Sequence, residues 1–188
     1  LSRKTICSWH LQLADLSIAE LAMIDHVFLT HTHLDHIASL PLMVDTVGDR
    51  RSQPLTVYGT EAVLTILRNH IFNWAIWPDF SEIPTADKPF MRFQTIELGQ
   101  TVKLGGRQLT PLPVEHTVPA VGYQIDSGQA SLVFSGDTGI CDGFWKAVNK
   151  VRNLKHLIVE CAFSMPAIPA SLACLAGASL AATCWRRH

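Results

Sequence analysis

The sequence predicts an α/β fold in which helices cover two β-sheets, and three observations carry this prediction. Strand–helix units occupy the first part of the chain, alternating strands separated by glycine turns follow, and a further helix–strand unit comes last. A chain of 188 residues is long enough for one domain with a layered core. No repeat or low-complexity linker divides it, so the pattern favours a single α/β sandwich.

The first part of the chain alternates strands with helices. Ile24–Thr30 has a continuous apolar core, as expected for a strand buried on both faces. Apolar residues then recur at helical spacing from Ile37 to Val47. Leu55–Tyr58 is a second short strand, and Thr60 is the predicted N-cap of the helix that follows it. This order is typical of parallel strands joined by helices.

From residue 92 onward the pattern changes to that of hairpins. Arg92–Leu98 alternates between apolar and polar residues. Val121–Ile125 and Leu132–Phe134 flank an Asp-Ser-Gly turn, which predicts a hairpin. Gly143–Val151 then has the pattern of a helix, and the apolar run Leu157–Val159 that of a buried strand.

Composition excludes several classes of protein. The chain is 48% hydrophobic and 16% charged with a formal net charge of −1, which excludes general disorder and argues against a basic nucleic-acid-binding protein. Its five cysteines include no Cys-x-x-Cys pair, so we expect neither a disulfide scaffold nor a cysteine zinc cluster, and a reducing, cytoplasmic location is favoured. Leu1–Leu13 contains no apolar run of secretory-signal length.

Residues 31–36, with the sequence HTHLDH, carry the strongest chemical signal. His31 and His33 lie two apart in an extended segment, so their side chains project to the same side and can bind one ion. Asp35 and His36 follow where the chain turns into a helix and can face a second ion. Imidazole and carboxylate together suit Zn²⁺, Mn²⁺ or Fe²⁺. The alternative is a solvated polar turn that caps a helix.

Two later positions could complete such a centre. His116 follows the strand-like segment Gln108–Val114 and could join His31 and His33, although a single histidine is often only a packed or surface residue. Asp137 lies in the small-residue sequence SGDTG, directly after an apolar strand. Asp137 could be a carboxylate that bridges both ions, or it could simply form an Asx-turn.

These motifs resemble a known family. HTHLDH, a later single histidine and the aspartate of SGDTG resemble the metallo-β-lactamase superfamily, an αββα fold that binds two metals at one edge of its sheets. More narrowly, HTHLDHIASLPLMVDT, HIFNWAIWPDF, EHTVPAVGY, SGDTG and LIVECAF resemble class II 3′,5′-cyclic-nucleotide phosphodiesterases. The resemblance covers about residues 14–164.

The resemblance implies a metal-dependent phosphodiesterase that hydrolyses cyclic-AMP-like nucleotides to 5′-monophosphates. The implied ligands are His31, His33 and His116 on one metal, Asp35 and His36 on the other, and Asp137 between them. Two divalent ions, zinc first and manganese or iron as alternatives, would share a hydroxide that attacks phosphorus. Asp35 and Asp137 would be the catalytic residues that hold this hydroxide.

Four further residues carry weaker expectations. Glu160, at the end of a strand, could orient a ligand histidine or be an ordinary strand-end charge. Trp74 and Trp77 could stack on a purine, or they could belong to the core or to a homodimer contact. Thr117 beside His116 is a third candidate substrate contact. The expected partner is a small cyclic nucleotide, with no nucleic acid and no membrane.

Both ends of the chain depart from the family pattern. Residues 1–13 lack the family's leading hairpin and its Asp-Ala-Gly segment, and residues 165–188 supply only His188 where the family has a helix and a last metal-binding histidine. We therefore expect a family-like domain over residues 14–164 between unmatched ends, and a sandwich that lacks its first strands and last helix. The alternative is an inactive remnant left by truncation or a shifted reading frame.

Three other functions stay open. An RNA 3′-processing nuclease would have the same metal pair, although the scattered Lys and Arg residues form no basic stripe. A lactone or thioester hydrolase would use the metals on a carbonyl carbon. Residues 161–185 contain no Asp, Glu, Lys or Arg, and Cys161–Cys184 could be a membrane span, although prolines and serines make it only marginally hydrophobic.

Overall fold

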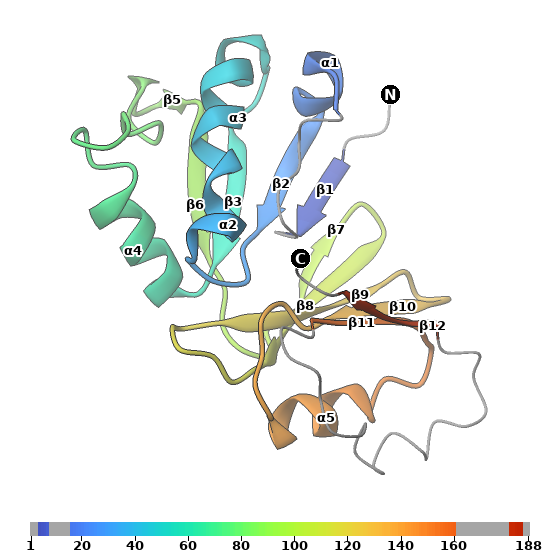
Figure 1. The fold of residues 1–188 in the computed structure, drawn as a ribbon. Helices are drawn as coiled ribbons and strands as arrows, with labels where there is room; N and C mark the ends of the chain where they lie inside the picture. Colours follow the sequence, from blue (N-terminus) through green and yellow to red (C-terminus); the bar gives the residue numbers. More distant parts are fainter. Residues whose placement is uncertain (1–3, 8–15, 161–180, 186–188) are drawn as a thin grey trace. The chain divides into compact units, whose positions relative to one another are not determined.

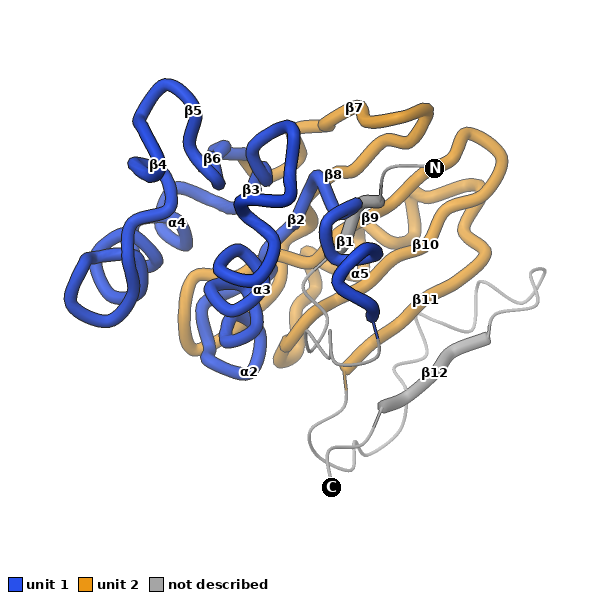
Figure 2. Tube along the Cα trace, turned by 90° about the horizontal axis from the view of Figure 1, so that it is seen from above, with its two compact units in different colours: residues 1–96 blue, residues 97–188 orange. Residues whose placement is uncertain are grey.

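A computed structural model describes residues 4–7, 16–160 and 181–185, with side chains for residues 16–160. The chain divides into two compact units, residues 1–96 and residues 97–188, which Figure 2 colours blue and orange. Each unit contains its own main β-sheet, with several helices packed against it in unit 1 and the described helix α5 in unit 2 (Figure 1). The boundary lies close to the change of sequence pattern at residue 92.

Unit 1 contains a four-stranded sheet whose strands are all parallel. Its strand order is β1 (Lys4–Cys7), β2 (Ile24–Phe28), β3 (Leu55–Gly59) and β6 (Met91–Thr95). The helical segments are α1 (Ile18–Leu21), α2 (Leu34–Ile37), α3 (Ser39–Val47), the 3-10 turn η2 (Gly48–Arg50) and α4 (Glu61–His70). Strands β4 (Pro84–Thr85) and β5 (Lys88–Pro89) form a small hairpin before β6. Parallel strands place their carboxyl ends at one edge, so the segments that follow β2 and β3 begin at that edge.

Two side-chain caps explain where helices of unit 1 begin. Ser17 and Glu20 form a capping box at the start of α1, in which the Glu20 amide donates to the Ser17 hydroxyl at 3.3 Å and the Ser17 amide donates to the Glu20 carboxylate at 3.0 Å. At the start of α4, the Thr60 hydroxyl accepts from the Val63 amide at 3.4 Å. The predicted N-cap at Thr60 is therefore confirmed.

The core of unit 1 follows the predicted periodicity. Helix α3 contributes Leu40, Val44 and Val47 from one face, and α4 contributes Val63, Leu64 and Leu67. These side chains pack with the buried residues of β2 and β3 and with Phe72 and Phe80 from the loop after α4. The amphipathic helices and the apolar strands thus form one hydrophobic cluster.

Unit 2 contains a six-stranded mixed sheet in the order β12-β11-β10-β9-β8-β7. The strands are β7 (Val102–Leu104), β8 (Arg107–Pro113), β9 (Val121–Asp126), β10 (Ser131–Phe134), β11 (Leu154–Glu160) and β12 (Ala181–Trp185). The ladder from β7 to β10 is antiparallel, whereas β10, β11 and β12 are parallel. Helix α5 (Asp142–Val148) joins β10 to β11 and packs Phe144 and Val148 against Leu112, Val133 and Leu157 of the sheet. The predicted hairpin across residues 126–128 is confirmed.

Both ends of the chain contribute a described strand. The N-terminal segment, expected to leave the first sheet without a strand before β2, supplies β1, which pairs in parallel with β2. Residues 181–185, which overlap the proposed membrane span Cys161–Cys184, form β12. The rest of that span, and His188, lie outside the described residues. Within the described part of the chain, no helix is long and apolar enough to cross a membrane.

Candidate metal centre

The unit 1 part of the candidate site begins where β2 ends. The Leu29 amide donates to the Tyr58 carbonyl at 2.9 Å and continues the pairing with β3 by one residue. Thr30 and His31, which come next, are fully buried. Thr30 Oγ1 lies 3.1 Å from His31 Nδ1, so the hydroxyl engages one ring nitrogen and Nε2 is the nitrogen that can bind a metal.

Three imidazoles meet in this part of unit 1. The His31 ring lies 4.8 Å from the His33 ring in an edge-on arrangement and 4.1 Å from the His36 ring. A possible ligand nitrogen of His31 lies within 4.8 Å of one on His33. Asp35, with a side chain that is 38% exposed, places Oδ2 3.6 Å from His36 Nε2. The four residues therefore gather nitrogen and oxygen donors of the kind that zinc, manganese and iron bind.

Local backbone geometry produces this cluster. His33 has extended backbone angles and is the N-cap residue of α2, whose first turn is closed by a 2.9 Å bond from the His36 amide to the His33 carbonyl. The chain thus changes from extended to helical between His33 and Leu34. This change brings a residue three positions along the helix back towards the strand end. The predicted grouping of His31, His33 and His36 is present within unit 1.

The unit 2 part of the candidate site lies at the ends of β8, β10 and β11. His116 Nε2 is 3.8 Å from Asp137 Oδ2, and their side chains are 16% and 11% exposed. Two ligands that each lie about 2.0–2.1 Å from a zinc ion can be up to about 4 Å apart, so this separation fits two ligands of one ion. A carboxylate oxygen of Glu160 lies within 4.8 Å of one on Asp137.

Two glycines determine the path of the chain before Asp137. Gly136 has φ 61°, a left-handed conformation that favours glycine. Gly122 on β9 lies directly against the backbone that leads to Asp137. A Cβ at Gly122 would lie 2.8 Å from the Phe134 carbonyl oxygen and 3.0 Å from that of Ser135. The close approach of β9 to this segment therefore requires a residue without a side chain.

Four residues beside these candidate ligands were not predicted from the sequence. Thr30 contacts His31, and Gly122 lies against the backbone before Asp137. Ser135 and Thr138 accept from the amides of Glu160 and Glu115. Ser135 and Thr138 were visible only as small residues of the sequence SGDTG. Their hydroxyl groups, placed on both sides of an acidic residue, were the one available signal.

The weaker substrate candidates lie on two different segments. Trp74 is 59% exposed with φ 65° in the loop that follows α4, and Trp77 packs partly buried against the unit 1 core. Helix α4 runs back from the carboxyl end of β3, so this loop begins away from the edge that carries His31. Thr117 is an exposed neighbour of His116. Substrate contact by these three residues stays a prediction.

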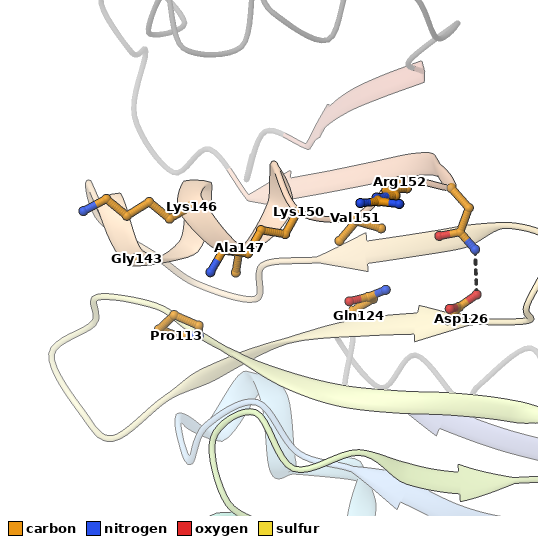
Figure 3. Close-up of a pocket in the computed structure, with 10 residues that line it drawn as sticks. Pro113, Gln124, Asp126, Gly143, Lys146, Ala147, Lys150, Val151 and Arg152 are labelled. Carbon is orange, nitrogen blue, oxygen red and sulfur yellow. Dashed lines mark hydrogen bonds between the residues drawn. The ribbon is translucent and has the colours of Figure 1, made fainter.

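A groove of about 630 Å³ lies on the α5 face of the unit 2 sheet (Figure 3). Its lining residues are Pro113, Gln124, Asp126, Gly143, Lys146, Ala147, Lys150, Val151, Arg152 and Asn153. None of them is an expected metal ligand. In Figure 3 the amino group of Lys146 points away from Arg152, so the basic residues do not converge on one anion.

Comparison with known proteins identifies relatives. The sequence pattern of the beta-lactamase superfamily domain matches residues 7–179. A probable 3′,5′-cyclic-nucleotide phosphodiesterase of Yersinia pestis is 29% identical over 155 residues, which are 74% of this chain and 44% of that protein. A 3′,5′-cyclic-nucleotide phosphodiesterase of Schizosaccharomyces pombe is 26% identical over 77% of this chain and 45% of that protein. A ribonuclease Z of Thermococcus kodakarensis is 30% identical over 53% of this chain and 29% of that protein. The chain thus spans less than half the length of these curated relatives.

Solved structures confirm the predicted fold class. Unliganded yeast PDE1 matches with a TM-score of 0.69 and 20% identity, over 82% of this chain and 49% of that one. The metallo-beta-lactamase fold protein YhfI from Bacillus subtilis matches with a TM-score of 0.63 and 21% identity, over 85% of this chain and 57% of that one. At these identities the likeness concerns the fold alone.

Proposed function

We propose, because this chain belongs to the beta-lactamase superfamily, that it is a metal-dependent phosphodiesterase that opens 3′,5′-cyclic nucleotides to 5′-monophosphates. The observation that carries the proposal is the donor set at the strand ends. Three imidazoles and one carboxylate gather in unit 1, and His116 with Asp137 lies at the ends of two strands in unit 2. Relatives named as cyclic-nucleotide phosphodiesterases support the choice of substrate.

The ligand assignment for two divalent ions follows the sequence motifs. His31, His33 and His116 would hold one ion, Asp35 and His36 would hold the other, and Asp137 would contribute to both. The 3.8 Å separation of His116 Nε2 and Asp137 Oδ2 supports this assignment, because it suits two ligands of one ion. Zinc is the first candidate, with manganese and iron as alternatives.

The chain's own residues then have distinct tasks. When bound, a pair of divalent ions supplies Lewis-acid chemistry, since it lowers the pKa of water and neutralises charge on phosphate oxygens. Thr30 engages Nδ1 of the His31 ring and leaves Nε2 as the nitrogen that would bind a metal. Asp35, whose side chain is 38% exposed, would orient the attacking water as well as bind metal. Glu160, with an oxygen within 4.8 Å of one on Asp137, orients the adjoining ligands.

A second candidate is an RNA-processing nuclease, which the ribonuclease Z relative favours. That relative matches 53% of this chain, whereas the phosphodiesterases match 74% and 77%. The near-neutral net charge of −1 also disfavours a polyanionic substrate. We therefore place the cyclic nucleotide first. A homodimer remains a prediction.

The test is a metal titration followed by an activity assay on the purified chain. We expect about two metals per chain and hydrolysis of cyclic AMP with added Zn²⁺ or Mn²⁺. Asp35→Ala should abolish turnover, whereas Asp49→Ala, which removes a carboxylate that is 77% exposed in the same unit, should leave it unchanged. Cleavage of a transfer-RNA precursor or of a lactone without cyclic-AMP hydrolysis would favour the other hydrolases. Metal binding without any turnover would favour the inactive remnant.

A further inference from the structure

We propose that the hydroxyl groups of Ser135 and Thr138 are positioning groups that hold the Asp137 carboxylate between His116 and Glu160. This inference rests on the proposed function, because it assigns a role to the segment that carries a proposed metal ligand. The two hydroxyls lie on opposite sides of Asp137 in the sequence, and each bonds to a different neighbouring strand end.

Thr138 joins the Asp137 segment to the His116 segment. Its hydroxyl oxygen accepts from the Glu115 amide at 3.2 Å and donates to the Gly139 carbonyl at 3.0 Å. The Gly139 amide in turn donates to the Glu115 carbonyl at 2.6 Å. Both backbone polar groups of Glu115 are thus bonded to the segment after Asp137. His116 is the next residue, so these bonds limit how far the His116 ring can move from the carboxylate.

Ser135 joins the same segment to β11. Its side chain is fully buried, donates to the Gly136 carbonyl at 2.6 Å and accepts from the Glu160 amide at 3.2 Å. The Ser135 amide continues the ladder with a 3.0 Å bond to the Ile158 carbonyl. Ser135 therefore connects the residue where β10 ends with the residue that carries the second carboxylate.

Asp137 depends on these bonds because its segment has no regular structure. Residues 136–141 lie between the end of β10 and the start of α5, outside any helix or strand ladder. A metal ligand in such a segment needs partners that fix its position before the ion arrives. Groups that orient metal ligands in this way commonly change metal affinity by about 10–100-fold when they are removed.

The test compares Thr138→Val and Thr138→Ser in the full chain by calorimetric titration with Zn²⁺ and with Mn²⁺. We expect Thr138→Val to weaken metal binding about tenfold and Thr138→Ser, which keeps the hydroxyl, to restore it. Ser135→Ala should weaken binding by a similar factor. The melting temperature of metal-free Thr138→Val should change no more than in the controls, whereas Ser135→Ala, which removes a buried hydroxyl, should also lower it.

Two matched controls remove hydrogen-bonded hydroxyls elsewhere in unit 2. Thr101→Val breaks the 2.8 Å bond between the exposed Thr101 and Thr110 hydroxyls, and Ser127→Ala removes a hydroxyl from the β9–β10 turn. Both should bind metal like the wild type. Equal metal affinity in Thr138→Val and Thr101→Val, or no recovery in Thr138→Ser, would overturn the proposal.

A metal-free measurement separates this inference from the proposed function. Amide hydrogen exchange at Glu115 should become faster in Thr138→Val, and exchange at Glu160 should become faster in Ser135→Ala, because each amide loses its acceptor. If the wild-type chain binds no metal, the proposed function fails, and exchange at these two amides then decides whether the hydroxyls hold the segment. Unchanged exchange at both amides would overturn the inference.

Discussion

Thr30 Oγ1 lies 3.1 Å from His31 Nδ1, and both residues are fully buried at the end of β2. The buried hydroxyl cannot exchange this partner for water, and the ring cannot rotate without losing this contact. The pair therefore determines which nitrogen of His31 is directed away from the strand. This contact gives the first prediction.

Thr30→Val should weaken metal binding about 10–100-fold and cost about 1–3 kcal/mol of stability, because a buried ring nitrogen loses its hydrogen-bond partner. Thr30→Ser should retain most of both. Metal titration and urea unfolding measure the two effects. Thr46→Val, which removes an exposed hydroxyl bonded to the Leu42 carbonyl in α3, is the control and should change neither. Wild-type metal affinity in Thr30→Val would contradict this role for Thr30.

Gly122→Ala should destabilise unit 2 and weaken metal binding together. The added Cβ would lie 2.8 Å from the Phe134 carbonyl oxygen, so the backbone before Asp137 must shift. Such overpacking typically costs about 1–3 kcal/mol. Gly139→Ala is the control, because its Cβ would meet only the Glu115 carbonyl at 3.6 Å. Urea unfolding and metal titration of both variants check this, and equal behaviour of the two would contradict it.

Asp126 should make the stability of the chain depend on acidic pH. The Gly128 amide at 2.7 Å and the Asn153 side-chain amide at 2.9 Å hold the pKa of the Asp126 carboxyl below its ordinary value. A carboxyl group whose pKa is lower in the folded than in the unfolded protein stabilises the fold above the unfolded-state pKa of about 3.9. This stabilisation is lost as the pH falls through the folded-state pKa. The free energy of unfolding of the wild type, measured in urea, should therefore fall more steeply below about pH 4 than that of Asp126→Asn. Parallel pH profiles of the two proteins would contradict this.

Local sequence patterns predicted the elements that carry the site. The N-cap at Thr60 and the turn after Asp126 depend on neighbours a few residues away, so a single sequence reveals them. The HTHLDH motif likewise places its three imidazoles through one strand-to-helix transition. Such features require no knowledge of distant parts of the chain.

Long-range contacts could not be predicted in the same way. The bond from Glu160 to Ser135 joins residues 25 apart, and the approach of Gly122 to Phe134 depends on strand register. The two-residue strands β4 and β5 are too short for any periodicity to indicate. The left-handed backbone of Trp74 also has no local signal, because residues of this type rarely adopt it.

Trp74 gives the last prediction, which separates backbone strain from a role in binding. Its φ of 65° costs an L-residue about 1–2 kcal/mol, and its side chain is 59% exposed. Trp74→Gly should therefore be more stable towards urea than Trp74→Ala by about 1 kcal/mol, since both lose the ring and only alanine keeps the Cβ clash. If the ring stacks on a purine, KM for cyclic AMP should rise equally in both variants and stay unchanged in Ile76→Ala, an exposed neighbour in the same loop. An unchanged KM in both tryptophan variants would exclude substrate contact and leave the strained loop as a candidate protein contact. Equal stability of the two variants would contradict the strain argument.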